Sequence, residues 1–236
     1  MSEIVGVFGD SYAYSDQHQK AAWVDLLQNK FNYTINCYAY PATSLFWSYK
    51  QFMQHKDKCN KIIFTITADT RLYTRHIGYP MSNLYTIETL IQNNKDTLRT
   101  NSMYPILEAA KGYYKYLVEP EYCRWVHSKL IAEIIDICQK ESKQLILIPT
   151  EETDIYCQNI FTMSLLDITT KELFFQFEDP VFRQETTRRS CHMSAKNNLI
   201  MATLLNDLLQ GKQRTVSLSD FTFEKVDNPE LYWTMK

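Results

Sequence analysis

Residues 4–11 read Ile-Val-Gly-Val-Phe-Gly-Asp-Ser, an apolar run that ends in a Gly-Asp-Ser turn ahead of a helix-like segment. The short apolar run at 4–8 predicts a buried strand. In an open α/β sheet ligands bind where the parallel strands end, so Ser11 follows the strand at the expected binding edge. A serine hydroxyl close to backbone N–H groups has the surroundings of a nucleophile. The tripeptide alone equally fits a turn that is capped by Asp10 and Ser11.

The rest of the chain alternates short apolar runs with amphipathic stretches. Strands are predicted at 33–39, 61–67 and 144–149, and helices at 17–30, 45–55, 120–142 and 194–210. A short edge strand is predicted at 173–177. Ser194 is the expected N-cap of the last helix, and Gly211 is the expected glycine at its end. This order of elements predicts an α/β fold with a mostly parallel sheet.

Two segments fall outside this alternation. Residues 70–119 are rich in Tyr, Asn and Thr and read as an insertion without regular structure, and such insertions commonly form lids or binding surfaces. Residues 213–236 read as a C-terminal tail that packs on the body or on a partner. We therefore expect one α/β domain over residues 1–212, with the insertion at about 70–119, followed by the tail.

Composition narrows the functional classes. The chain has 25 Lys and Arg against 27 Asp and Glu, and without a positive field it is not expected to bind nucleic acid. It contains only 5 glycines, and neither a GxGxxG nor a Walker-type loop is present. The cysteines show no CxxC pair and no zinc-type spacing. We expect no metal and no cofactor, no membrane span and no signal peptide, and hence a cytoplasmic protein.

A nucleophilic serine needs a base, and His192 is the best-placed histidine. It lies in Ser190-Cys191-His192-Met193-Ser194, directly before the last predicted helix. In a parallel α/β fold this loop lies at the same edge as Ser11, so the two side chains are expected within hydrogen-bond reach. His18, His55 and His127 fall in predicted helices, and His76 falls in the insertion; these are read as surface or supporting residues.

The two ends of the chain together resemble the SGNH (GDSL-type) hydrolases. Gly9-Asp10-Ser11 followed by Trp23-Val24-Asp25-Leu26-Leu27 is similar to the opening block of that family. Cys191-His192-Met193-Ser194-Ala195-Lys196-Asn197-Asn198 resembles the closing histidine block, in a form associated with bacteriophage-encoded members. Ala42-Thr43-Ser44 and Thr67-Ala68-Asp69-Thr70 fall where the two middle blocks belong. The resemblance covers residues 1–70 and 120–210.

The resemblance implies a flavodoxin-like three-layer α/β/α fold and ester hydrolysis through an acyl-enzyme. Ser11 would attack the ester, and His192 would take the proton and return it to the leaving alcohol. The oxyanion would be bound by the backbone N–H groups of Ser11 and Ala42 and by a side chain of the third block. Asp10 would brace the turn. For a phage-encoded member, the place of action would be the host cytoplasm or the virion.

The acid of the catalytic triad departs from the family pattern. The family carries this acid three residues before the histidine, where this chain has Arg189. Glu185 or Asp179 could fold back to support the imidazole, or a backbone carbonyl could hold the ring in a Ser-His dyad. Loss of such an acid lowers rates by on the order of 10⁴.

The two middle blocks depart as well. Asp69 stands where the family has an asparagine, and an ionised carboxylate cannot donate to an oxyanion. Arg71, Thr67 or Thr70 are the alternative donors. Ala42 replaces a glycine, which is tolerable if its φ is negative.

Two further clusters have a functional and an ordinary interpretation. Arg183, Arg188 and Arg189 would suit an anionic substrate, but such a cluster is also an ordinary solvated surface. An aromatic-rich stretch would stack on sugar rings, or it belongs to a core or an interface; it consists of Tyr104, Tyr113, Tyr114, Tyr116 and Trp125.

Three functions follow, in order of preference. The first is a serine esterase that acts on small ester groups, for example O-acetyl groups of a glycan. The second is a catalytically degenerate protein of the same fold that serves as a binding or virion-associated structural component. The third is a module that binds a phosphorylated ligand at Ser11 and the following helix N-terminus.

Overall fold

The computed structural model describes residues 3–14, 22–71, 73, 84–93, 104–150, 160–176 and 193–223. Its centre is a sheet of four parallel strands in the order β2-β1-β3-β4. The strands are β1 (Ile4–Gly9), β2 (Thr34–Ala39), β3 (Lys61–Ile66) and β4 (Gln144–Pro149). This order is that of the flavodoxin-like doubly wound sheets, so the expected α/β fold with a parallel sheet is confirmed.

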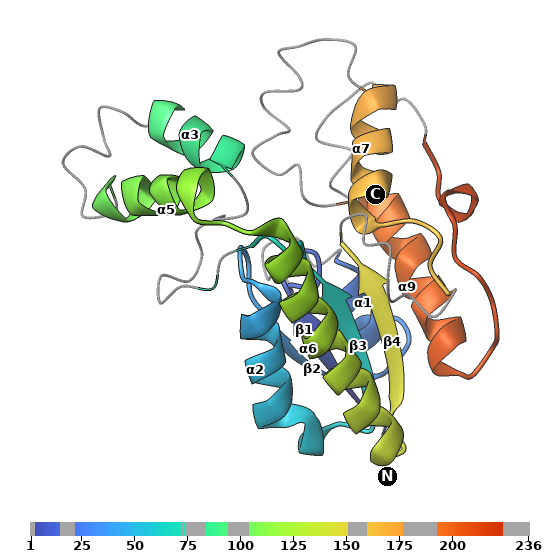
Figure 1. The fold of residues 1–236 in the computed structure, drawn as a ribbon. Coiled ribbons are helices and arrows are strands. Elements are labelled where there is room, and N and C mark those ends of the chain that lie inside the picture. Colours follow the sequence, from blue (N-terminus) through green and yellow to red (C-terminus); the bar gives the residue numbers. More distant parts are fainter. Residues whose placement is uncertain are drawn as a thin grey trace.

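Helices cover both faces of the sheet (Figure 1). On one face, α1 (Trp23–Asn29) and α9 (Ala195–Leu209) pack on Val5, Val7 and Ile63. On the other face, α2 (Leu45–His55) and α6 (Pro120–Lys140) pack on Phe8, Phe64 and their neighbours. Residues in adjacent positions along β1 point to opposite cores because side chains alternate across a strand. The result is a three-layer sandwich.

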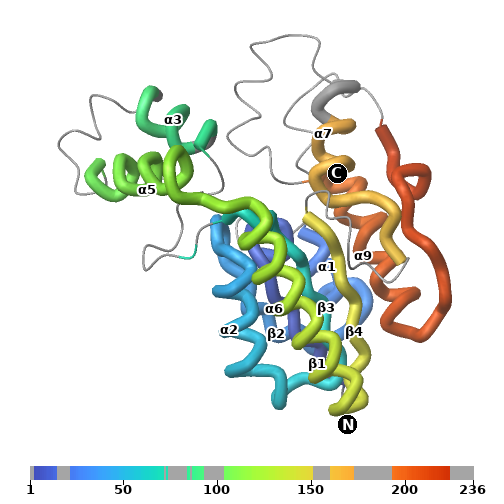
Figure 2. The backbone as a smooth tube through the Cα atoms, viewed as in Figure 1, coloured from blue at the N-terminus to red at the C-terminus, as the bar shows by residue number. Residues whose placement is uncertain are grey.

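Helical structure occurs in the region expected to be an irregular insertion. Residues Leu84–Asn93 form α3 and residues Tyr104–Tyr116 form α5. The two helices share a small core of their own, built on Ile87, Leu107 and Tyr114. They stand beside the sheet and not on either of its faces, as the tube in Figure 2 shows. The expectation of an overlong loop is therefore wrong for these described segments.

A helix also replaces the edge strand predicted at 173–177. Residues Leu165–Gln176 form α7, which begins with mutual hydrogen bonds between Ser164 and Asp167. This prediction is wrong for residues 173–176, and residue 177 lies outside the described part. The β-prone Leu-Phe-Phe sequence is overridden because it continues a helix that is already capped upstream.

The ends of α9 follow the sequence signals. The Ser194 hydroxyl accepts a hydrogen bond from the Asn197 N–H at 3.2 Å, as expected of an N-cap. At the other end Gly211 has φ +81°, and Lys212 N–H donates to the Asp207 carbonyl at 3.0 Å. Together with the bond from Gly211 N–H to the Leu208 carbonyl this is a Schellman motif. The segment beyond α9 returns to the body, where Val216 pairs with Phe161 and both are buried.

Among the described residues, no helix combines the length and the apolar character needed to cross a membrane.

Candidate active site

The turn after β1 is sharply constrained at Gly9. Its φ is +152°, and a Cβ at this position would lie 1.7 Å from the Thr65 hydroxyl oxygen of β3. No side chain fits there, so the close approach of β1 and β3 requires glycine. Beyond Gly9, the turn is closed by the Ala13 N–H, which donates to the Asp10 carbonyl at 3.1 Å. Ser11 is half-buried at the carboxyl edge of the sheet.

Asp10 is fully buried and ties the strand ends together. One carboxylate oxygen accepts from the Tyr12 N–H at 3.1 Å, and the other pairs with the Arg71 guanidinium at 2.9 Å. Arg71 also donates to the Thr43 carbonyl at 3.2 Å. Thr43 in turn donates from its hydroxyl to the Tyr40 carbonyl at 2.7 Å. Arg71 therefore ties together the loops that follow β1 and β2.

Ala42 adopts the left-handed conformation, with φ +59°. The sequence analysis made its replacement of glycine conditional on a negative φ, and that condition is not met. The cause is local: the Thr43 hydroxyl bends back onto the Tyr40 carbonyl, and the chain must reverse between β2 and α2. In the described part of the chain, no group accepts a hydrogen bond from the backbone N–H of Ser11 or of Ala42.

The first and last sequence blocks are cross-linked by Trp23 and Asn198. The Trp23 indole N–H donates to the Tyr12 carbonyl at 2.8 Å. The Trp23 backbone N–H donates to the Asn198 side-chain oxygen at 3.0 Å. The Asn198 amide donates to the Met193 carbonyl at 2.7 Å. Tyr12 follows Ser11, and Met193 follows His192, so this chain of hydrogen bonds joins the neighbours of both predicted catalytic residues.

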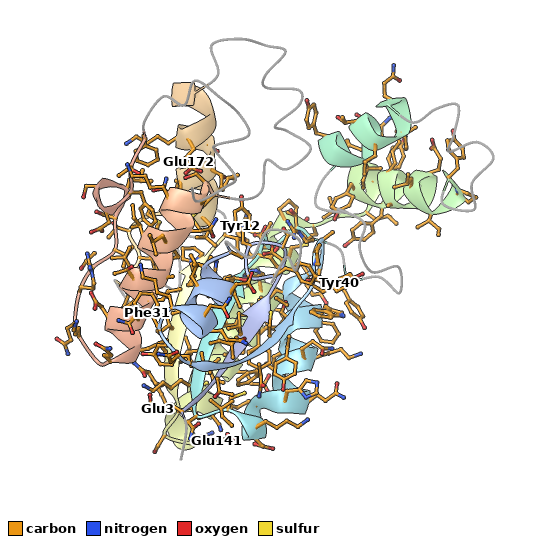
Figure 3. All side chains as sticks on the ribbon, turned by 180° about the vertical axis from the view of Figure 1, so that it is seen from behind. Glu3, Tyr12, Phe31, Tyr40, Glu141 and Glu172 are labelled. Atoms are coloured by element: carbon orange, nitrogen blue, oxygen red, sulfur yellow. The ribbon has the colours of Figure 1, made fainter. Side chains whose placement is uncertain are left out.

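A second link runs through α7. The Tyr12 hydroxyl lies 3.3 Å from the Thr169 hydroxyl, and Thr169 itself donates to the Leu166 carbonyl. Three residues along, fully buried Glu172 accepts from the Ser194 backbone N–H at 3.1 Å and from its hydroxyl at 2.6 Å. Residues three apart share a helix face, at about 5–6 Å between Cβ atoms. Figure 3 shows Tyr12 and Glu172 at the same end of the molecule, opposite Glu3 and Glu141.

The remaining predicted site residues of the last block lie outside the described residues. These are His192, Glu185, Arg188 and Arg189, together with Asp179 and Arg183.

Asp69 lies in the wall of a neighbouring cavity. It lines a cavity of about 220 Å³ that also has Arg71, His127 and Tyr122 in its wall, while Ser11 and Ala42 are not among the lining residues. Within the described segments Asp69 makes no hydrogen bond or ion pair, and none joins it to the Ser11 turn. The described residues hold no group of three or more His, Cys, Asp and Glu side chains arranged to bind a metal ion.

His127 is buried and lines this cavity, whereas the sequence predicted a surface or supporting residue. Its Nε2 lies 2.7 Å from the Thr67 carbonyl, which can only accept, so Nε2 carries the proton and donates. Burial lowers the pKa of His127, and the bond to Thr67 and the charge of Asp69 oppose that shift only in part. In the neutral ring Nδ1 is therefore a hydrogen-bond acceptor.

Two other groups of the cavity lining, Tyr113 and Cys123, have raised pKa values. Burial raises the pKa of Tyr113, and the nearby Cys123 and Tyr122 add to the effect. Burial likewise raises the pKa of Cys123, with a further contribution from Asp69. Cys123 is consequently a weak nucleophile, and the cavity offers hydrogen bonding and not a thiolate.

Two residues were missed by reasoning from the sequence. His127 carries a signal: with Ile131, Ile134 and Cys138 it continues the buried stripe of α6 at helical spacing. Glu172 carries none, because it sits between Lys171 and Leu173 in a segment without a motif, and only the packing of α7 against Ser194 reveals it.

No family model and no curated protein matches this chain. Among solved structures, it is similar to the psychrotrophic esterase EstA from Pseudoalteromonas sp., at 16% identity and a TM-score of 0.40, over 89% of this chain and 98% of that chain. It is also similar to a putative lipolytic protein of the G-D-S-L family from Desulfitobacterium hafniense, at 8% identity and a TM-score of 0.28, over 68% of this chain and 87% of that chain. Both TM-scores lie below 0.5.

Proposed function

We propose that this chain is a serine ester hydrolase. Ser11 Oγ attacks the ester carbonyl while His192 takes its proton, and the tetrahedral oxyanion is bound by the backbone N–H groups of Ser11 and Ala42. Collapse of this intermediate breaks the bond to the alcohol, which leaves with the proton from His192. Water then attacks the acyl-enzyme, His192 again serves as base, and the carboxylic acid is released.

The observation that carries this proposal is the shared attachment to α7. Tyr12, next to Ser11, contacts Thr169, and Ser194, two residues after His192, is bound by Glu172 on the same helix face. Two stretches far apart in the sequence are thereby anchored within one helical turn of each other. This supports a contact between a hydroxyl and an imidazole at that edge.

In this proposal Glu172 is a positioning residue. Its buried carboxylate holds Ser194 and the Asn197 amide, and so fixes the chain directly after the proposed base. Glu185 and Asp179 stay the proposed partners for the second imidazole nitrogen. A base held by the adjacent backbone loses less freedom when it must align with a nucleophile.

The proposed substrate is a small acyl ester, such as an O-acetyl group of a glycan. Two exposed tyrosines flank the Ser11 turn: the rings of Tyr14 and Tyr40 meet edge to face at 6.0 Å. Such aromatic faces beside a proposed nucleophile suit the apolar face of a sugar ring.

Hydrolysis of p-nitrophenyl acetate and butyrate tests the proposal. Ser11→Ala is expected to lower kcat/KM by about 10³-fold or more, because the nucleophile is lost. Ser219→Ala, at an exposed serine remote from the turn, is the matched control and is expected to retain the wild-type rate. A fluorophosphonate probe should form an adduct on Ser11, identified by mass spectrometry. Equal rates in Ser11→Ala and wild type would refute the assignment.

A non-catalytic binding protein is the second candidate, and the third sequence block favours it. Asp69 offers no donor when ionised, and Arg71 already donates to Asp10 and to the Thr43 carbonyl. A folded protein that forms no fluorophosphonate adduct and hydrolyses neither ester would establish this alternative. An adduct on Ser11 contradicts it.

A further inference from the structure

The cavity beside the Ser11 turn is lined by apolar, aromatic and polar side chains, and this combination limits the kind of ligand that it can bind. Its walls come from the start of α2, from the segment after β3 and from α6, with Tyr113 contributed by α5. Apolar side chains such as Leu45, Val126 and Leu130 form part of the wall. At about 220 Å³ it is smaller than the roughly 300–1,000 Å³ of drug-sized sites, so it suits one ring and not a chain of rings.

Several polar groups of this cavity have hydrogen-bonding capacity that the described residues leave unused. His127 donates a hydrogen bond from Nε2 to the Thr67 carbonyl, which leaves Nδ1 as an acceptor. Asp69 makes no hydrogen bond or ion pair within the described part of the chain. An acyl chain placed here would leave these groups without hydrogen-bond partners, which is unfavourable for a buried polar group. The lining therefore disfavours a purely apolar occupant.

The charges in the lining disfavour an anionic ligand. An anionic ligand would meet the carboxylate of Asp69, which no nearby cation neutralises in an ion pair among the described residues. A cationic ligand could pair with Asp69, but it would lie beside the Arg71 guanidinium, which is in the lining and is itself paired with Asp10, so binding of a cationic probe decides this case. A neutral ligand with hydroxyl groups can donate one hydrogen bond to the Asp69 carboxylate and another to His127 Nδ1.

Aromatic rings complete the lining. Tyr73, Tyr113 and Tyr122 lie in the wall, and Tyr122 stacks on exposed Trp125 with ring centres 6.3 Å apart and planes at 23°. Aromatic faces of this kind contact the C–H face of a pyranose, while its hydroxyl groups point to the polar edge.

We propose that this cavity binds one neutral sugar ring. Arg71 connects it to the Ser11 turn through Asp10, and Ser44 belongs to both the cavity wall and the loop after β2. For the esterase, the bound ring would be part of the glycan that carries the ester. That role rests on the proposed function, whereas binding of the ring does not.

Saturation-transfer difference NMR on the full chain tests the proposal. The probes are methyl glycosides of neutral hexoses and of N-acetylhexosamines, with octanoate and choline as the competing apolar-anionic and cationic ligands. At least one glycoside is expected to bind saturably. Tyr122→Ala and Asp69→Asn should each weaken that binding by about tenfold, since the first removes a stacking ring and the second replaces a charged acceptor by a neutral, weaker one.

The control is Tyr85→Ala on α3, where the ring is 79% exposed and lies outside the cavity lining. It should bind the glycoside as the wild type does. Tyr122 is 63% exposed, so its replacement is not expected to prevent folding, and thermal unfolding of each variant verifies this.

Three results overturn the proposal: no glycoside binds to the folded wild type, octanoate or choline binds in place of the glycosides, or Tyr122→Ala and Asp69→Asn bind them unchanged. Failure of the esterase is separable from failure of this site. Glycoside binding without hydrolysis of p-nitrophenyl acetate refutes only the enzymatic function. Hydrolysis without glycoside binding refutes only the sugar site.

Discussion

The carboxyl edge of the sheet has two sides that treat buried polar groups differently. On the side of α7 and α9, the Glu172 carboxylate is surrounded by donors from Ser194 and Asn197. On the side of α6, buried His127 makes one hydrogen bond, to Thr67, and lines the cavity. A buried polar group whose hydrogen bonds are all made within the protein holds chain segments together. One that can still accept a hydrogen bond is suited to bind a ligand. The first side is a clamp and the second is a recognition surface.

The largest expected effect comes from breaking the clamp. Glu172→Gln keeps the size of the side chain but replaces one acceptor oxygen by a donor that faces the Ser194 and Asn197 donors. We expect the free energy of unfolding to fall by about 3 kcal/mol, as for removal of one partner from a buried charged network. Urea unfolding followed by circular dichroism at pH 7 measures this.

The matched control is Asp136→Asn on α6, a carboxylate whose side chain is 54% exposed and which pairs with Lys140. Its effect should stay below about 0.5 kcal/mol, as for exposed ion pairs. Should both variants unfold at the same urea concentration, Glu172 is not a clamp and its role in holding the proposed base is lost with it.

A smaller effect, on the recognition side, is a pH dependence that arises from His127. Burial lowers its pKa in the folded protein, while in the unfolded chain it titrates near the ordinary value of 6.5. Below pH 6.5 the unfolded chain therefore binds a proton that the folded protein does not, and stability falls until the folded pKa is reached. Above pH 6.5 this contribution is constant.

Urea unfolding of wild type and His127→Gln at several pH values between 5 and 8 measures this slope. Gln retains a donor for the Thr67 carbonyl and does not titrate, so its stability should decline less on acidification. Carboxylates are common to both proteins and cancel in the difference. Asp69→Asn should extend the decline to lower pH, because it removes a charge that raises the pKa of His127. Parallel curves for wild type and His127→Gln would show that His127 is not held neutral.

Much of the sheet follows from local sequence patterns, as β3 illustrates. Lys61–Ile66 is a short β-branched run buried in the middle of the sheet, and such runs have few alternatives. The caps of α9 were likewise predictable, since Ser194 and Gly211 act through their own backbone and nearest neighbours. These signals act through residues that are close in the sequence, so the elements they predict do not depend on contacts between distant segments.

The clamp and the cavity were not predictable in this way, because both depend on contacts between distant segments. Glu172 matters only since α7 packs where Ser194 begins α9, 22 residues later. The helices α3 and α5 were missed because their Tyr- and Asn-rich sequences suggest a loop, yet each buries an apolar face on the other. The burial of His127 could be predicted from the helical spacing of α6, but the cavity that it lines depends on the segment after β3.

The smallest expected effect concerns Ala42, in the loop between β2 and α2. Its φ of +59° is unfavourable for alanine by about 1–2 kcal/mol, whereas glycine adopts this conformation freely but loses more entropy on folding. Ala42→Gly is therefore expected to raise the free energy of unfolding by about 0.5 kcal/mol. Ala132→Gly, at an exposed position inside α6, is the control with the opposite sign, a loss of about 1 kcal/mol. A loss at both positions would mean that Ala42 is not strained, and that the bonds from Arg71 and Thr43 do not force this loop into its shape.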